Sequence, residues 1–111
     1  MPFLTIYTNS DIDDKQMSVD AANLVANQLG KPVRYVVVNV IHNANMSFDG
    51  NNQTKGALIE MKSIGFGDKN SLAKQLTDLV VSRIDVEPSF VNVWFVDMPA
   101  NTVAIGGRLL G

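Results

Sequence analysis

Two stretches of the chain place apolar residues at helical spacing. In both stretches the apolar positions fall at i, i+4, i+7, i+8 and i+12, and the second set lies 55 residues after the first. Such spacing puts one apolar stripe along an amphipathic helix. The positions are Met17, Ala21, Leu24, Val25 and Leu29 in the first stretch, and Leu72, Leu76, Leu79, Val80 and Ile84 in the second.

Helix-boundary residues surround both stretches. Asp13 and Asp68 precede them at equivalent places and are predicted to be N-caps. Gly30 and Pro32 end the first predicted helix, because glycine favours the turn after a helix and proline cannot continue it. Glu87-Pro88 lies just past the second.

A predicted strand lies on either side of each helix. The leading strands are 3–8 and 58–63, and the following strands, rich in β-branched and aromatic residues, are 35–41 and 90–96. Each half is therefore strand–helix–strand, and a crossover helix between neighbouring strands implies a parallel pair.

The chain is thus a single domain over 1–111, built from two pseudo-repeats at about 2–41 and 57–96. We expect an α+β fold of duplicated β-α-β units, with a four-stranded mixed sheet and two helices on one face. The joint 43–55 is rich in Asn, Asp and Gly, and Met46–Phe48 inside it is a candidate short strand. The other sheet face also carries apolar residues and no chain is left to cover it, so another subunit is expected there.

Composition excludes several classes of function. The 111 residues are 46% apolar and 18% charged, as in a globular domain, and the net charge is −2. The chain has no excess of basic residues that would favour nucleic acid or an anionic membrane as a partner. No apolar run is long enough for a membrane span. The chain has no cysteine and one histidine, which excludes a thiolate or His-rich metal site. No cofactor is implied. The first residues have no basic segment typical of a signal peptide, so a cytoplasmic location is expected, with leaderless export left open.

Three short motifs together resemble a known family. Pro2 follows the initiator Met and opens a strand, Gly30-Lys31-Pro32 follows the first helix, and Ser63-Ile64-Gly65 closes the strand that opens the second half. In this order and at these spacings, the chain resembles the macrophage migration inhibitory factor (MIF) branch of the tautomerase superfamily, from Pro2 to about Met98. The resemblance implies a homotrimer and a catalytic N-terminal proline.

The resemblance assigns a general base to Pro2. Removal of Met1 would free its amine, and an α-amine titrates near pH 8, lower still in an apolar pocket or beside a cation. Such a base can take the proton alpha to a carbonyl and return it elsewhere, which converts keto to enol. The alternative is that Pro2 only leads a strand, where proline is sterically acceptable.

Other site residues follow from the same resemblance. Lys31 is expected to contact the substrate carboxylate or carbonyl, or else to be only a cation near a helix C-terminus. The Ile64 backbone amide is expected to bind a substrate oxygen, although a buried strand-end isoleucine is compatible with the same position. Lys62 stands where vertebrate members have histidine, and it either holds a keto-acid carboxylate or points at solvent.

The expected pocket walls depart from the family. Asn92 and Trp94 replace a tyrosine and an asparagine, and Ile105-Gly106 replaces a late Trp-Asn pair. Activity on the aromatic enols that the family favours is thereby in doubt. The expected lining residues are Phe3, Tyr35, Trp94 and Ile105.

We therefore expect an isomerase that acts on a phenylpyruvate-type α-keto acid, with three candidate readings of the residues. Retention of Pro2, Lys31 and Ile64 favours the enzyme. The altered walls favour a MIF-fold binding or signalling protein with weak or no catalysis, or a structural oligomer with a vestigial proline.

Overall fold

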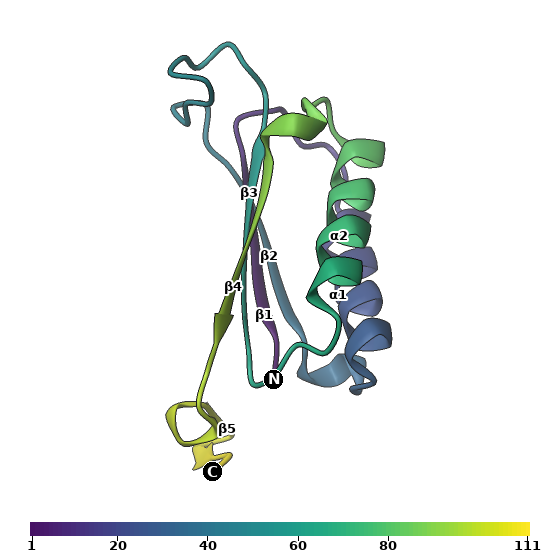
Figure 1. Ribbon diagram of the computed structural model, residues 1–111, viewed down its shortest axis with the longest axis vertical. Coiled ribbons are helices and arrows are strands. Elements are labelled where there is room, and N and C mark those ends of the chain that lie inside the picture. The colour runs from purple at the N-terminus through teal and green to yellow at the C-terminus, as the bar shows by residue number, and fades with distance from the viewer.

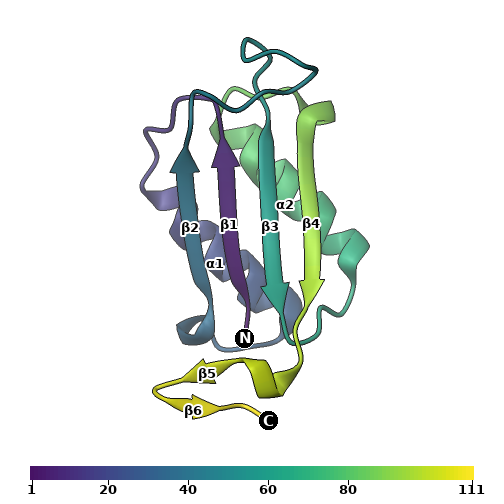
Figure 2. The same cartoon turned by 90° about the vertical axis from the view of Figure 1, so that its left-hand side faces the viewer.

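The computed structural model describes residues 1–111 and has a sheet layer and a helix layer, with both helices on the same face of the sheet (Figure 1). The four strands lie in the order β2-β1-β3-β4 (Figure 2). The fold class and the placement of the helices confirm the sequence prediction. The elements of the main body are β1 (Phe3–Thr8), α1 (Gln16–Leu29), β2 (Val37–His42), β3 (Ala57–Ser63), α2 (Lys69–Arg83) and β4 (Val91–Asp97).

Strand directions confirm the internal duplication. Strands β1 and β2 are parallel, as are β3 and β4, while β1 and β3 join the two halves in antiparallel pairing. At the amino end of β1, Phe3 lies between Val37 of β2 and Lys62 of β3. The start of β1 therefore lies beside the start of β2 and the end of β3, where the site is built.

The second strand of each half begins later than predicted. Residues Val33–Tyr35 and Pro88–Phe90 form short 3-10 turns, η1 and η2, directly before β2 and β4. Each turn follows or contains a proline, whose fixed φ suits a turn better than a paired strand. Tyr35 and Phe90, predicted as strand residues, belong to these turns.

One predicted N-cap is confirmed and the other is wrong. The Asp68 side chain accepts a hydrogen bond from the Ser71 amide at 3.1 Å, which satisfies a free donor of α2. Helix α1 begins only at Gln16, so Asp13 is too far from its first turn to cap it. Asp14 instead accepts from the Gln16 amide at 2.9 Å.

The end of α1 fixes the segment that carries Lys31. Gly30 has φ +63°, and the amides of Gly30 and Lys31 donate to the Asn27 and Ala26 carbonyls, at 3.3 and 3.0 Å. These two bonds form a Schellman motif, which requires the left-handed conformation at Gly30. The chain therefore leaves the helix in one direction, toward the sheet.

The core lies between the sheet and the two helices. Fourteen buried residues form one cluster, and each large aliphatic side chain in it contributes about 1.5–3 kcal/mol by leaving water. Its fully buried large members are Leu4, Ile6, Met17, Val25, Ile59, Met61, Leu72, Leu76 and Val80. None of the helices has both the length and the apolar character needed to cross a bilayer.

The other sheet face is uncovered and carries large apolar side chains. Trp94 is 63% exposed and Val37 is 57% exposed, and Phe3, Ile41 and Val96 are exposed with them. The alternation of buried and exposed positions along each strand places these residues opposite the helices.

Two connecting segments differ from the secondary structure that the sequence predicts. Met46–Phe48 is not a strand: Phe48 makes only an isolated bridge with Asn51, around a tight turn in which Asp49 and Gly50 both have positive φ. After β4, a third 3-10 turn, η3 (Ala100–Thr102), leads into an unpredicted hairpin of β5 (Ala104–Ile105) and β6 (Arg108–Leu109). Figure 2 shows this hairpin running from the end of β4 back past the ends of β3 and β1.

Candidate active site

A mostly apolar pocket lies at the amino end of β1. Pro2 is buried there, and its carbonyl accepts a hydrogen bond from the Val37 amide at 3.1 Å, which ties the N-terminus to the start of β2. The cavity volume is about 290 Å³. The lining residues come from the N-terminus, η1 with the start of β2, and the C-terminal hairpin: Met1, Pro2, Phe3, Tyr35, Val37, Val103, Ala104 and Ile105.

Lys31 joins this pocket to the end of β3. Its Nζ donates a hydrogen bond to the Ile64 carbonyl oxygen at 3.0 Å in a partly buried position. Lys31 is also one of the groups that lower the pKa of the Met1 terminal amine. The structure thus brings the N-terminus, Lys31 and Ile64 together, although they are far apart in the sequence.

The terminal amine is electrostatically perturbed. Burial, together with the hydrogen bond and the positive charge of Lys31, lowers the pKa of the Met1 amine from 8.0 to about 6. All of these causes lower the pKa. An apolar surrounding and a neighbouring cation each penalise the protonated form of the amine. An amine at this place is therefore largely neutral at pH 7 and able to accept a proton.

The turn after β3 presents the Ile64 backbone. Met98 donates to the Ser63 carbonyl at 2.8 Å, and the Gly65 amide donates to the Asp97 carboxylate at 3.1 Å. These bonds fix the residues on either side of Ile64, and outside the strand ladders no hydrogen bond uses the Ile64 amide nitrogen. Its N–H is thus available beside the Lys31 ammonium.

Sequence-predicted lining residues divide into two groups. Phe3, Tyr35 and Ile105 line the N-terminal pocket together with Pro2. Lys62 lies on the open sheet face, where its Nζ is 3.7 Å from a Glu60 carboxylate oxygen.

Asn92 and Trp94 also lie outside the Pro2 pocket of the same chain. They line a shallow depression near the 43–55 joint, with Glu60 and Leu58 beside them. Trp94 stands opposite Glu60 in β3, which in turn stands opposite Thr5 in β1, so two strand spacings separate Trp94 from β1. The role of Asn92 and Trp94 at the pocket stays a prediction.

Three residues that contribute to the site were not predicted. Val103 and Ala104 reach the pocket because the hairpin folds back, and Asp97 holds the turn at Gly65. The Gly106-Gly107 pair was the available signal for the hairpin, since both residues adopt positive φ in its turn. No local pattern signals the Asp97 contact.

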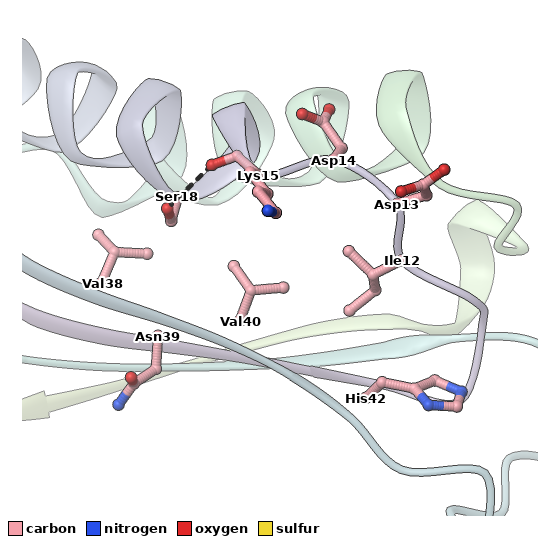
Figure 3. Close-up of a pocket in the computed structure, with 9 residues that line it drawn as sticks. All are labelled: Ile12, Asp13, Asp14, Lys15, Ser18, Val38, Asn39, Val40 and His42. Atoms are coloured by element: carbon pink, nitrogen blue, oxygen red, sulfur yellow. Dashed lines mark hydrogen bonds between the residues drawn. The ribbon is translucent and has the colours of Figure 1, made fainter.

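A second groove lies at the far end of β2, between that strand and the start of α1 (Figure 3). Ile12, Val38 and Val40 form its apolar part, and polar side chains including Asp13, Lys15 and Asn39 surround them. The imidazole of His42 is 3.7 Å from an Asp11 oxygen. The structure contains no group of three or more His, Cys, Asp or Glu side chains that could hold a metal ion. The terminal amine with the lowered pKa lies at the N-terminal pocket and not at this groove.

Comparisons with known proteins agree with this geometry. The family model described as macrophage migration inhibitory factor (MIF) matches residues 1–111. A MIF homolog of Brugia malayi is 34% identical, with 100% of both chains covered. The MIF of Xenopus tropicalis is 32% identical over 91% of this chain and 92% of its own.

Solved structures show the same fold at lower identity. The MIF of Oncomelania hupensis superposes with a TM-score of 0.90 at 20% identity, over 100% of this chain and 83% of the other. The MIF homologue of Prochlorococcus marinus gives a TM-score of 0.90 at 22% identity, over 98% and 99% of the two chains.

Proposed function

The chain belongs to the macrophage migration inhibitory factor family, and from that premise we propose that it is a tautomerase acting on an α-keto acid of the phenylpyruvate type. The observation that carries the proposal is an N-terminal amine at an apolar pocket whose pKa is lowered by burial and by Lys31, together with the hydrogen bond from Lys31 to the Ile64 backbone. Tautomerase activity is general in the family, whereas the substrate and the residue roles below are our proposals.

Pro2 acts as base and acid in this mechanism. Removal of Met1 exposes the Pro2 secondary amine at the base of the pocket, close to the place where the Met1 amine has its lowered pKa. The neutral amine takes a proton from the carbon next to the substrate carbonyl, and the electron pair moves to the carbonyl oxygen as an enolate. The protonated proline then returns the proton, to oxygen in one direction or to carbon in the other.

Lys31 and Ile64 stabilise the charge that develops during this transfer. The Lys31 ammonium is positioned to bind the substrate carboxylate or the enolate oxygen, and the free Ile64 N–H is a second donor. Fixed donors aimed at a developing oxyanion act more strongly in an apolar pocket than in water. The lining side chains Phe3, Tyr35 and Ile105 accommodate the apolar part of the substrate.

We also propose that the chain forms a homotrimer through the open sheet face. That face carries exposed Trp94, Val37 and Val96, which a soluble monomer would leave in water. In an assembly, Asn92, Trp94 and Lys62 of one copy become candidates to complete the pocket of the next. Asn92 and Trp94 lie on β4, two strand spacings from β1 within one chain, which supports this arrangement for them, whereas Lys62 lies opposite Phe3 in its own chain.

The alternative function is a MIF-fold binding or signalling protein with weak or no catalysis. One specific observation favours it: the strand that would complete the pocket carries Asn92 and Trp94, which lack an acidic hydroxyl of the tyrosine type. A bulky indole there would fill volume that an aromatic substrate needs.

The test compares three forms of the N-terminus in a phenylpyruvate enol ketonisation assay, after intact mass has established whether Met1 is present. Processed protein should be active, and Pro2→Gly should lose most of the rate while keeping some activity through its primary amine. An N-terminal extension should abolish the activity, because it leaves no free amine at Pro2. Equal activity of the three forms would exclude Pro2 as the base, and a folded but inactive processed protein would favour the binding protein.

A further inference from the structure

We propose that Arg34 is a specificity residue that selects keto acids carrying a second carboxylate over monocarboxylates. This inference rests on the proposed tautomerase function and names the substrate class of the same site. It assigns Arg34 to the rim of the Pro2 pocket, where its guanidinium binds the end of the substrate that does not react.

The position of Arg34 is fixed by its neighbours. Its Cζ lies 5.0 Å from the centroid of the Tyr35 ring, and Tyr35 itself lines the pocket. The turn that carries both residues is held by hydrogen bonds from Tyr35 to the Pro32 carbonyl and from Val36 to the Val33 carbonyl, at 3.1 and 3.0 Å. Stacking on the ring of a pocket-lining residue holds the guanidinium against Tyr35 before any ligand arrives.

Arg34 has no carboxylate partner in the chain. Of the nine basic residues, Lys62, Lys74 and Arg83 lie within ion-pair distance of an Asp or Glu, and Arg34 does not. No acidic residue lines the pocket. Two acids of β3 and β4 have partners of their own, since Glu60 lies 3.7 Å from Lys62 and Asp97 accepts from the Gly65 amide.

Two more cations belong to the surroundings of this pocket. Lys31 lowers the pKa of the amine of the lining residue Met1, and Arg108 stands directly opposite the lining residue Ile105 in the C-terminal hairpin. By contrast, Asp11, Asp13 and Asp14 gather near the far end of β1 and β2. A chain with a net charge of −2 thus collects positive charge at its pocket, which attracts a dianion more strongly than a monoanion.

Lys31 and Arg34 have different roles in substrate binding. Lys31 holds the carboxylate next to the reacting carbonyl, because it lies beside the amine that moves the proton. The Arg34 guanidinium offers paired N–H donors that match a second carboxylate in a bidentate contact. Substrates of this class are keto acids with a carboxylate on the carbon chain beyond the carbonyl, such as oxaloacetate.

The test measures kcat/KM of processed protein on the enols of oxaloacetate and phenylpyruvate. Arg34→Gln should lower kcat/KM about 10-fold on oxaloacetate, as expected for loss of one charge-assisted contact, and less than about 2-fold on phenylpyruvate. Arg34→Lys should recover part of the loss, because it keeps the charge but not the paired donors. Lys15→Gln is the matched control: it removes the same charge at the acidic end and should change neither substrate. Equal loss on both substrates, or none, would overturn the inference.

A second readout separates this inference from the proposed function. If processed protein turns over neither keto acid, the tautomerase proposal fails, and the selectivity is then measured by calorimetric binding of two inert probes, succinate and propionate. Succinate should bind wild type about 10-fold more tightly than Arg34→Gln, and propionate should bind both equally. Succinate affinity unchanged by Arg34→Gln would overturn the inference whatever the catalytic result.

Discussion

The Lys31 Nζ lies 3.0 Å from the Ile64 carbonyl oxygen, across 33 positions of sequence. Lys31 comes from the end of the first pseudo-repeat helix and Ile64 from the end of the first strand of the second repeat. The two repeats therefore meet at the N-terminal amine, and neither could form this site alone. Substitution of Lys31 therefore tests whether this arrangement is needed for activity.

Lys31→Ala should lower kcat/KM about 10- to 100-fold on a carboxylate substrate, because the variant loses a charge-assisted hydrogen bond. The methyl ester of the same keto acid, which has no negative charge, should be affected much less. Steady-state kinetics on the two substrates check this. A variant that folds, loses about 1 kcal/mol of stability with the Ile64 contact, and keeps normal kinetics on both would make Lys31 a structural residue only.

The same substitution should raise the pKa of the terminal amine. Lys31 is one cause of the lowered pKa of the Met1 amine, and we expect it to lower the pKa of the Pro2 amine in the same way once Met1 is removed. Its removal should therefore raise that pKa, while the contribution of burial remains. In the pH–rate profile of processed protein, the acidic limb should shift to higher pH, since the base must lose its proton to act. Lys31→Arg, which keeps the charge, is the control and should leave the limb nearly in place.

Much of the fold follows from local pattern, and β1 was predicted with its observed bounds. Helical spacing located both helices, because the buried stripe is continuous along each of them. Pro32 and Pro88 explain the late starts of β2 and β4, which were predicted too early because each turn ends in an aromatic residue, Tyr35 or Phe90, that is also common in strands. The two-residue strands of the C-terminal hairpin are too short for an alternating pattern to identify them.

The site was predictable only where family motifs mark it. The N-terminus, Lys31 and Ile64 lie together in the structure, whereas the roles of Pro2, Lys31 and Ile64 in catalysis stay predictions. Asp97 was missed because its contact with the Gly65 amide joins residues 32 positions apart, a relation that depends on the register of β3 and β4. Trp94 was predicted to line the pocket, and one chain alone does not place it there.

Trp94 gives a direct test of assembly, because it is the only tryptophan and lies 63% exposed on the open sheet face. Trimerisation should bury it and shift its emission to shorter wavelength, and dilution should reverse the shift together with the sedimentation coefficient. Val96→Glu on that face should produce monomers. Val19→Glu, the same change at a 48% exposed position of α1, should not. A stable monomer at micromolar concentration by light scattering would contradict the trimer.

Arg83 should stabilise the fold in a pH-dependent way. It forms ion pairs with Asp14 at 2.9 Å and with Asp20, and its guanidinium lowers the pKa of both carboxyls below the ordinary 3.8. A carboxyl with a lowered folded-state pKa contributes stability above its unfolded pKa and loses it as pH falls through the folded value. The melting temperature of Arg83→Gln should therefore be below that of wild type at pH 6 to 7, and the gap should close below about pH 4.

A matched substitution controls for simple loss of surface charge. Lys74→Gln breaks the Lys74–Asp78 pair, whose side chains are 77% and 64% exposed, so it should have little effect at either pH. A melting-temperature gap for Arg83→Gln that stays constant between pH 7 and pH 3 would mean that Arg83 acts through packing and not through its carboxylate partners.

Gly56 holds the joint between the two halves, and Gly56→Ala should destabilise the protein through close contact. The glycine is buried, and a Cβ added there would lie 2.6 Å from the Phe90 carbonyl oxygen and 2.8 and 2.9 Å from two Phe48 ring carbons. Its backbone cannot easily shift, because its carbonyl accepts from the Thr8 hydroxyl at 2.6 Å and its amide donates to the Asn9 side chain at 3.1 Å. We expect a loss of about 1–3 kcal/mol in the free energy of unfolding, measured by urea denaturation.

The double variant Gly56→Ala with Phe48→Leu separates the two sources of that strain. Leucine in place of Phe48 removes the ring contacts but not the contact with the Phe90 carbonyl, which is backbone and cannot rotate away. The stability of the double variant should therefore exceed the value expected from adding the two single losses, with a coupling of about 0.5–1 kcal/mol, yet stay below that of Phe48→Leu alone. Strict additivity would mean that the ring already moves freely aside, and that the Phe90 carbonyl alone requires glycine at this position.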